Sequence, residues 1–338
     1  MTKNRLKCFL FNDLEPWERR SVEALLEEIS TRISVETIWV TESQRRFFHF
    51  TGEGQYWIVA KNWQRALHFL SSKRFKSGKL YVSVLDVNQH KSSLYGLSFQ
   101  SILSRSSKSL TFLVHSPMEY RFLRDIKKVP QEQVQLLPLP FYRSSRSYQR
   151  KNSDEFRLGT LCQFDTESNI PFAIAVSHFI KQCAPQVRMD IMGRGPLYNH
   201  FAKMVNELEI GEMTNVVETV SDFDISQWDL FLYFPLRNAH FIPVMLAAAS
   251  KVPVLSVDIP GIEKFITSGK NGVVLSSYEI KSMGEKIIEL MNNPFQRKTM
   301  AENLWNDLRE KYSLETISEQ YYRLFFKTSS ISDWKEAA

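Results

Sequence analysis

The stretch "YFPLRNAHFIPVMLAAASKVPVL" (233–255) decides the fold class of this chain. It starts in an apolar run, crosses a polar loop, and continues through a helix-forming segment into a second apolar run. Pro243 stands just inside the expected helix, where the first turn tolerates proline. The order strand, loop, helix, strand predicts a parallel βαβ unit.

The same alternation runs outward from this stretch along the chain. In the segment 15–30, for example, Trp17, Val22, Leu25, Leu26 and Ile29 fall on one helical face. Strand–helix alternation of this length predicts parallel sheets with helices on both faces. The expected strands are 6–11, 35–40, 55–60, 79–87, 109–116, 134–140, 156–164, 187–193, 215–220, 229–234, 252–257 and 272–275. The expected helices are 15–30, 63–72, 93–107, 117–127, 170–183, 197–210, 243–250, 279–293 and 295–327, the last broken near Ser313.

The pattern stops once, at "YRSSRSYQRKNSDE" (142–155). This segment is polar, serine-rich and basic, and it has no periodicity, which is typical of an interdomain linker. We therefore expect an α/β chain with two doubly wound, Rossmann-like domains. A ligand of such a pair is expected at the carboxyl ends of the strands, in the cleft between the domains.

Composition narrows the class of protein. Hydrophobic residues make up 43 % of the 338 residues, enough for a sizeable core, and no window is long and apolar enough for a transmembrane helix. Cys8, Cys162 and Cys183 are unevenly spaced, which favours free thiols in a reducing compartment over a disulfide or metal framework. We expect a cytoplasmic protein without a metal or a bound cofactor.

Charge is distributed unequally between the two halves. Residues 1–152 hold 25 Lys/Arg against 13 Asp/Glu, whereas residues 153–338 hold 18 against 24. A basic half suits anionic lipid, an anionic sugar acceptor or an acidic partner. Zinc-finger spacing, an RNP-like aromatic motif and a basic helix with heptads are all missing, so nucleic acid is not an expected partner.

Several segments in order resemble one known family. "MDIMGRGPLYNHFAKMVNELEI" (189–210), "NVVETVSDFDI" (215–225) and "VPVLSVDIPGIEKFITSGKNGVVL" (252–275) are similar to consecutive passages of the retaining, family 4-like GT-B glycosyltransferases (group 1). "SLTFLVHSPMEY" (109–120) and "KYSLETISEQYYRLFF" (311–326) resemble that family's histidine loop and closing helix.

The resemblance implies the GT-B fold, in which two Rossmann-like domains face a central cleft and the C-terminal helix crosses back to the first domain. The implied divisions are an acceptor-side domain at 1–141, the linker at 142–155, a nucleotide-sugar-side domain at 156–310 and the crossing helix at 311–338. The implied ligand is a nucleotide sugar and the implied activity is hexosyl transfer.

The donor-site residues of the family are missing. The basic pair that neutralises the diphosphate falls near Thr160 and Ser168, beside the acidic Asp165 and Glu167. The two glutamates that hold the sugar and the ribose are replaced by Asn238 and Leu246. The glycine-rich loop of the first domain is replaced by "NDLEPWERRS" (12–21), whose Pro16 and Trp17 obstruct close backbone approach.

Two interpretations follow. The first is a catalytically impaired homologue that acts in binding or assembly, because each lost charge-stabilising contact removes about 3 kcal/mol of transition-state stabilisation. The alternative is an active retaining transferase with a rebuilt donor site. Its tentative catalytic residues are His115 and Asn238, and its candidate ligand-binding residues are Arg19, Arg20, Gly193, Gly195, Arg237, Gly261 and Lys264. For the glycines a purely structural turn is the competing interpretation.

Basic residues beside aromatic ones in the first half suggest a surface for a partner. Arg45 and Arg46 lie in "QRRFFHF" (44–50), and Lys73, Arg74 and Lys76 follow an amphipathic segment. Such clusters suit the inner face of an anionic membrane. A protein partner or a second copy of the chain is the alternative, and so is a plain solvated helix face.

Overall fold

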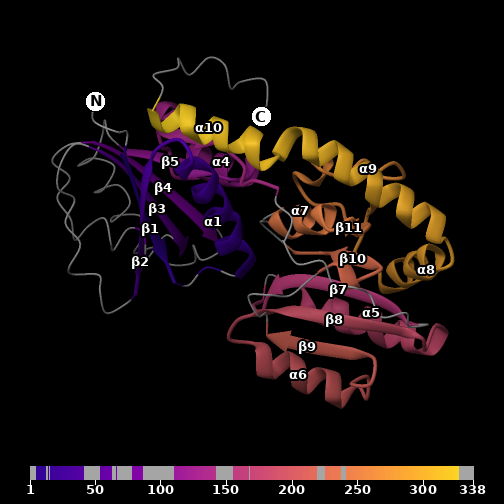
Figure 1. The fold of residues 1–338 in the computed structure, drawn as a ribbon. Helices are drawn as coiled ribbons and strands as arrows, with labels where there is room; N and C mark the ends of the chain where they lie inside the picture. Colours follow the sequence, from indigo (N-terminus) through magenta and orange to yellow (C-terminus); the bar gives the residue numbers. More distant parts are fainter. Residues whose placement is uncertain are drawn as a thin grey trace. The chain divides into compact units, whose positions relative to one another are not determined.

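The structure is a computed structural model, and it describes residues 5–12, 14, 16–41, 54–62, 66, 78–86, 110–141, 155–166, 168–218, 225–236 and 241–326. The chain divides into two compact units (Figure 1). The first combines Met1–Leu14, Glu18–Pro140 and Leu314–Ala338, and the second combines Glu15–Trp17 with Phe141–Ser313.

The first unit contains a parallel sheet with the strand order β2-β1-β3-β4-β5-β6. β1 is an inner strand of the sheet, since β2 and β3 flank it on opposite sides, as in a doubly wound domain. Its elements are β1 (Arg5–Phe11), α1 (Pro16–Ser30), β2 (Ser34–Val40), β3 (Gln55–Asn62), β4 (Lys79–Asp86), β5 (Leu110–Val114), α4 (Pro117–Arg121), the π-helical turn η2 (Phe122–Ile126), the short helix η3 (Gln131–Gln133) and β6 (Val134–Leu136).

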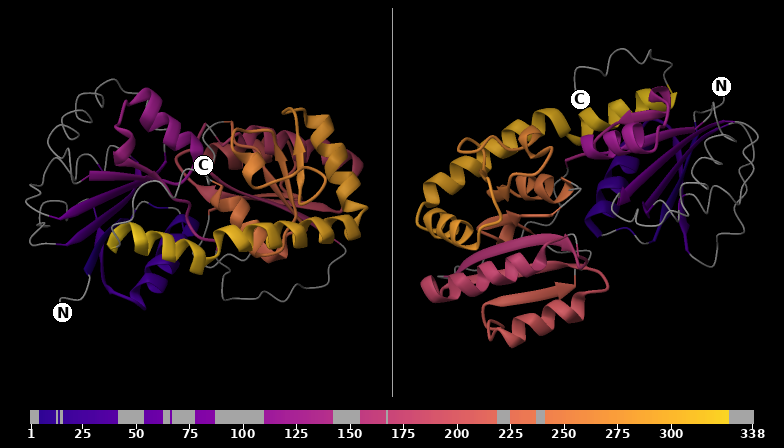
Figure 2. Two further views of the ribbon diagram at one scale, coloured as in Figure 1. Left: turned by 90° about the horizontal axis from the view of Figure 1, so that it is seen from above. Right: turned by 180° about the vertical axis from the view of Figure 1, so that it is seen from behind.

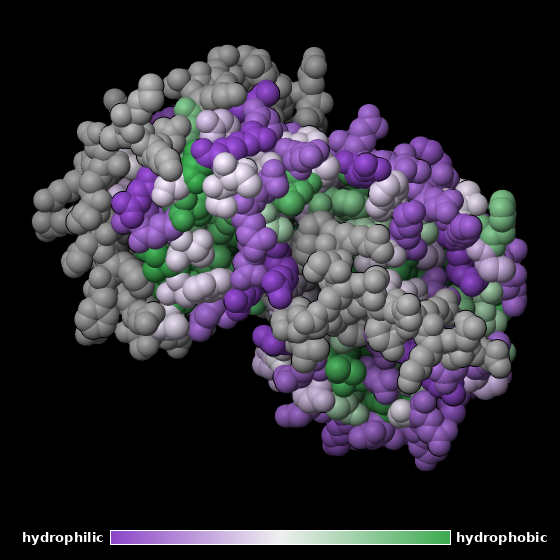
Figure 3. Space-filling model, viewed as in Figure 1, coloured by the Kyte–Doolittle hydropathy of each residue, from purple (hydrophilic) through white to green (hydrophobic). Residues whose placement is uncertain are grey.

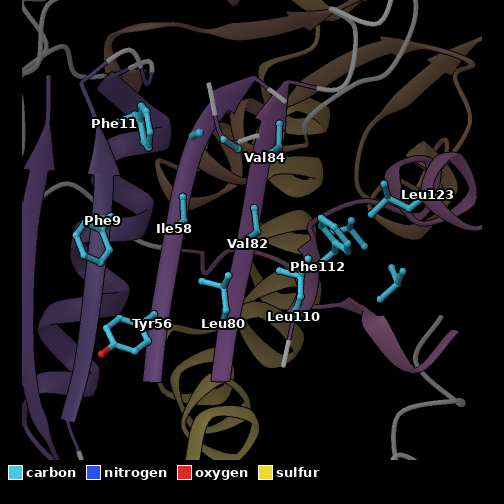
Figure 4. Packing of buried hydrophobic residues seen from close by; sticks show 14 of the residues in the cluster. Phe9, Phe11, Tyr56, Ile58, Leu80, Val82, Val84, Leu110, Phe112 and Leu123 are labelled. Carbon is cyan, nitrogen blue, oxygen red and sulfur yellow. The ribbon is translucent and has the colours of Figure 1, made fainter. Parts of the chain in front are cut away.

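One face of this sheet carries a continuous hydrophobic core (Figure 4). Alternate residues of neighbouring strands supply it, because successive side chains in a strand point to opposite faces. Phe9 and Phe11 of β1, Ile58 of β3 and Val82 of β4 are all nearly inaccessible to solvent. Leu123 of η2 packs into the same core.

The opposite face packs against α10 (Leu314–Phe326), the last described helix, which lies along the first sheet (Figure 2). The Trp57 ring lies 5.3 Å from the Tyr321 ring, and the Tyr81 ring lies 4.8 Å from the Phe325 ring. Tyr81 donates a hydrogen bond of 3.0 Å to the carbonyl of Leu324. Residues 314–326 therefore belong to the first unit, although they follow the second unit in the sequence.

The second unit contains another parallel sheet, with the order β12-β11-β10-β7-β8-β9. Its strands are β7 (Phe156–Gln163), β8 (Val187–Arg194), β9 (Thr214–Glu218), β10 (Leu230–Tyr233), β11 (Val254–Val257) and β12 (Val273–Leu275). Its helices are α5 (Ile170–Cys183), α6 (Tyr198–Glu207), η4 (Ile225–Gln227), α7 (Ile242–Ala249), η5 (Ile262–Lys264), α8 (Ile280–Met291) and α9 (Pro294–Tyr312).

The described elements match the expected ones except at a few points. The expected strand 134–140 ends at Leu136, and the expected helix 117–127 changes to π-helical turns after Arg121. The break expected near Ser313 is present, since Ser313 separates α9 from α10. The expected helix 93–107 and most of 63–72 lie outside the described residues, as does the linker up to residue 154.

Among the described residues, no helix has both the length and the apolar character needed to cross a membrane. On the face seen in Figure 3, hydrophilic residues predominate over the described helices. Among the described residues Phe295, at 82 %, is the most exposed of six large hydrophobic side chains that face solvent; the others are Ile126, Leu208, Val217, Leu236 and Ile280.

Candidate functional site

The site expected in the second unit lies where its strand order reverses. β7 is followed by β8 on one side, while β10 on its other side is followed by β11 and β12. Helices that leave such neighbouring strands diverge and open a crevice at the carboxyl ends, which is where open α/β sheets bind ligands. The segments at this edge are the β7–α5 turn, the β8–α6 turn, the start of α7 and the β11–η5 turn.

The β7–α5 turn contains the carboxylate of Asp165, which forms hydrogen bonds within the turn. Asp165 Oδ1 accepts hydrogen bonds of 2.9 Å from both the backbone N–H and the hydroxyl of Ser168. Thr160, the other position at which a cation is expected by resemblance, is a buried residue inside β7. Neither position supplies a positive charge, and Asp165 adds a negative one where α5 begins.

The helix α7 carries an apolar residue at the position of the second expected acid. Leu246 is partly exposed on α7, and its neighbours in the helix are buried. Pro243 lies in the first turn of α7 and removes one backbone donor there. Arg237 and Asn238, which precede α7, lie outside the described residues.

The two glycines of the β8–α6 turn are explained by packing. A Cβ atom on Gly193 would lie 2.0 Å from the carbonyl oxygen of Cys162, and one on Gly195 would lie 2.5 Å from the carbonyl oxygen of Phe164. Gly195 also has a φ of 151°. β8 and its turn therefore approach β7 too closely for any side chain, which accounts for both glycines without a ligand.

The β11–η5 turn is organised around Gly261, whose φ of 97° favours glycine. Its backbone N–H donates a hydrogen bond of 2.9 Å to the carboxylate of Glu263. Lys264 is the last residue of η5 and is partly exposed.

Three aromatic rings stack on one another at this part of the edge. The sequence did not lead us to expect them. The Phe241 ring lies 4.5 Å from the Phe265 ring at an interplanar angle of 24°. The Phe265 ring in turn lies 5.3 Å from the Tyr312 ring at 16°. The three residues come from the start of α7, the end of η5 and the end of α9. Their spacing in the sequence has no periodicity that would reveal the stack.

A second aromatic group lies beside the switch point. The Phe172 ring on α5 packs edge-on against Phe234 at 5.7 Å and against Tyr278 at 5.6 Å. The Tyr278 hydroxyl donates a hydrogen bond to the carbonyl of Pro235. Burial raises the pKa of Tyr278, and burial followed by the neighbouring Tyr278 raises the pKa of Tyr233 well above its usual value. Both phenols therefore remain neutral near pH 7.

His115, the tentative catalytic residue of the first unit, forms hydrogen bonds with other residues of that unit. Its Nδ1 lies 2.8 Å from the carbonyl of Leu137, which can only accept, so the proton is on Nδ1. The Tyr321 hydroxyl of α10 lies 3.4 Å from both of these atoms. Glu119 accepts hydrogen bonds from the backbone N–H groups of His115 (2.5 Å) and Ser116 (3.2 Å).

The two candidate arginines of α1 have partners in the first unit. Arg19 Nε donates a hydrogen bond of 2.8 Å to Glu23, and its guanidinium lies 4.2 Å from the Trp39 ring centroid. Arg20 lies 3.6 Å from the same carboxylate. The basic residues suggested for a membrane or partner surface, Arg45, Arg46, Lys73, Arg74 and Lys76, lie outside the described residues.

Comparison with known proteins finds a family match within the second unit. Residues 143–306 match the family described as "Glycosyl transferases group 1". A poly(ribitol-phosphate) alpha-N-acetylglucosaminyltransferase of Staphylococcus aureus is 26 % identical over 171 residues, which is 50 % of this chain and 35 % of that protein. The chain thus spans about a third of the length of this relative.

Two solved structures extend the likeness to both units. The crystal structure of TarM has a TM-score of 0.64 at 19 % identity, over 81 % of this chain and 55 % of that one. A structure of Anabaena HepE in complex with UDP-glucose has a TM-score of 0.68 at 13 % identity, over 94 % and 98 % of the two chains. These results and the two parallel sheets confirm the expected fold: the chain has the GT-B fold of the group 1 glycosyltransferases.

Proposed function

We propose that this chain is a catalytically impaired homologue of the group 1 glycosyltransferases that acts in binding or assembly. The observation that carries the proposal is the carboxylate of Asp165 in the β7–α5 turn, hydrogen-bonded to Ser168. A leaving diphosphate must be stabilised by positive charge or by aimed N–H donors. This turn instead presents an anion, and the anion already uses the N–H and hydroxyl of Ser168.

Leu246 supports the same proposal. A nucleotide ribose presents hydroxyl groups that lose water on binding and need hydrogen-bond partners, and an isobutyl side chain supplies none. The turn glycines do not count against the proposal, because Gly193 and Gly195 are required by the approach of β7 alone.

A turnover assay tests the proposal. Purified protein is incubated with UDP-glucose or UDP-N-acetylglucosamine, with and without polyol-phosphate acceptors, and released UDP is measured over hours. We expect no release above the buffer rate. Release proportional to protein concentration overturns the proposal.

Active transfer from a nucleotide sugar is the second candidate. It is favoured by the relatives themselves, whose names describe transferases, and by HepE, which was crystallised with UDP-glucose. On this chain Arg19, Arg20, Arg237 and Lys264 would meet phosphate, and His115 and Asn238 would meet the sugar. This candidate requires Arg19 to leave Glu23 and Trp39. It predicts that a nucleotide raises the melting temperature of the wild-type protein.

The partner surface remains a prediction from charge. The basic first half suits an anionic membrane surface, a cytoplasmic protein partner or a second copy of the chain. Co-sedimentation with vesicles of increasing phosphatidylserine content separates these cases. Binding that rises with the anionic fraction and falls with salt supports the membrane, and binding indifferent to both removes it.

A further inference from the structure

Phe241 lies at the edge of the second sheet where open α/β sheets bind their ligands. It is the N-cap residue of α7 and follows β10, one of the two strands at the switch point. The neighbouring β11 ends in the Gly261 turn. A glycine turn at the carboxyl end of a strand lets another group come close to the main chain, because it has no side chain.

The Phe241 ring fills this space. A Cβ atom placed on Gly261 would lie 3.0 Å and 3.1 Å from two carbon atoms of the ring. The ring therefore lies directly against the glycine, and a side chain at residue 261 would have to push it aside by a few tenths of an ångström and would adopt an unfavourable φ of 97°. Only 5 % of Phe241 is exposed to solvent.

The ring is held firmly. It stacks on Phe265, which stacks on Tyr312, and it lies 6.1 Å from the Tyr233 ring at the end of β10. Aromatic rings packed in this way gain from contact as well as from burial. A ligand that needed the same space would have to break the stack, so the ring is a stable occupant of the edge.

We propose that the Phe241 side chain occupies the position that the sugar ring of a nucleotide sugar would take at the carboxyl ends of β10 and β11. A phenyl ring and a pyranose ring are similar in size, so one excludes the other. The inference rests on the proposed function, because it treats this edge as the remnant of a donor site. If the inference holds, the wild-type protein binds a nucleotide sugar no more tightly than it binds the nucleotide alone.

The test compares matched ligands on matched variants. Calorimetric titrations use UDP with UDP-glucose, UDP with UDP-N-acetylglucosamine, and GDP with GDP-mannose. The variants are Phe241→Ala and the milder Phe241→Leu, which decides the question if the alanine variant does not fold. The control is Phe201→Ala, which removes an equally buried ring from α6, a helix that packs against β9.

In Phe241→Ala we expect at least one nucleotide sugar to bind five-fold or more tightly than its nucleotide. We expect a smaller difference in Phe241→Leu and none in the wild type or in Phe201→Ala. The inference is overturned if the Phe241 variants fold but bind no nucleotide sugar more tightly than the matching nucleotide. This holds whether or not the nucleotide itself binds. The proposed function fails separately, through turnover by the wild-type protein.

Discussion

Asp165 and Ser168 are joined by two hydrogen bonds of 2.9 Å to a single carboxylate oxygen, at the turn that leads from β7 into α5. The pair lies at the edge of the sheet where parallel α/β domains bind their ligands. A carboxylate in this position opposes a diphosphate. The relationship is therefore the structural basis of the proposal that the chain binds a nucleotide-sugar donor poorly.

Removing the charge of Asp165 while keeping its shape should improve nucleotide binding. In Asp165→Asn the amide oxygen still accepts from Ser168, but the repulsion is lost. At the dielectric constant of bulk water, two unit charges about 4 Å apart repel by about 1 kcal/mol, or roughly five-fold in Kd for pyrophosphate or UDP. Titration at low salt measures it. Glu279→Gln, an exposed acid at the start of α8, serves as control, and equal effects of the two variants would contradict the local explanation.

The glycines of the β8–α6 turn should be needed for stability. Gly193→Ala brings a methyl group into the backbone of Cys162 and should lower the free energy of unfolding by about 3 kcal/mol. Gly269→Ala is the matched control. Its φ of 82° makes alanine costly by about 1 kcal/mol, but no atom lies within 4 Å of the added group. Urea unfolding measures both, and a cheaper substitution at Gly193 would contradict the packing argument.

Substitution of Asn271 should lower the free energy of unfolding more than substitution of most other polar residues of the second unit. Its side chain accepts from the backbone N–H of Thr267 at 2.7 Å and donates to Phe265 O at 3.2 Å and to Asp307 at 2.8 Å. Only 2 % of the residue is exposed. Asn271→Ala removes the side-chain partner of the Thr267 N–H and of the Phe265 carbonyl, while Asp307 keeps Lys270, and it should cost about 3 kcal/mol in urea unfolding. Lys270→Ala, which removes an exposed ion pair with Asp307, should cost under about 1 kcal/mol.

The attachment of α10 to the first sheet should depend on the Tyr321 ring more than on its hydroxyl. Tyr321→Phe removes contacts of 3.4 Å to Leu137 and His115 and should cost about 1 kcal/mol. Tyr321→Ala also removes a fully buried ring that packs on Trp57 and should cost about 4 kcal/mol. Similar losses in the two variants would indicate that the polar contacts hold the helix.

Stability should fall in alkaline solution. Burial, followed by the nearby Glu119 carboxylate, raises the pKa of Tyr321 well above its usual value, whereas in the unfolded chain it is about 10. Up to that pH both states keep the proton. Above it the unfolded state loses the proton first, so the free energy of unfolding declines by about 1.4 kcal/mol per pH unit for this residue. Tyr321→Phe should make the decline shallower, and an unchanged slope would contradict the assignment.

Much of the fold was predictable from residue patterns. Apolar runs such as 229–234 and 252–257, separated by a polar loop and an apolar helix-forming segment, predicted parallel strands because buried strands of this kind are continuous apolar runs. The expected strand 134–140 was too long: β6 ends at Leu136, and Pro138 and Pro140, which lack the N–H that a strand ladder needs, were the signal for that end.

The site was predictable only in what it lacks. The absence of charge at Thr160 and Leu246 is visible in the sequence. The ring of Phe241 over Gly261 is not, because the two residues meet only when β10 and β11 pair and the loops after them fold together. The reason for Gly193 likewise depends on the register of β7 against β8.

Direct titration of the wild-type protein with UDP-glucose tests the central claim most directly. The account predicts a Kd no tighter than the millimolar range and no difference between UDP-glucose and UDP. A Kd in the micromolar range that depends on the sugar, together with release of UDP over time, would contradict it.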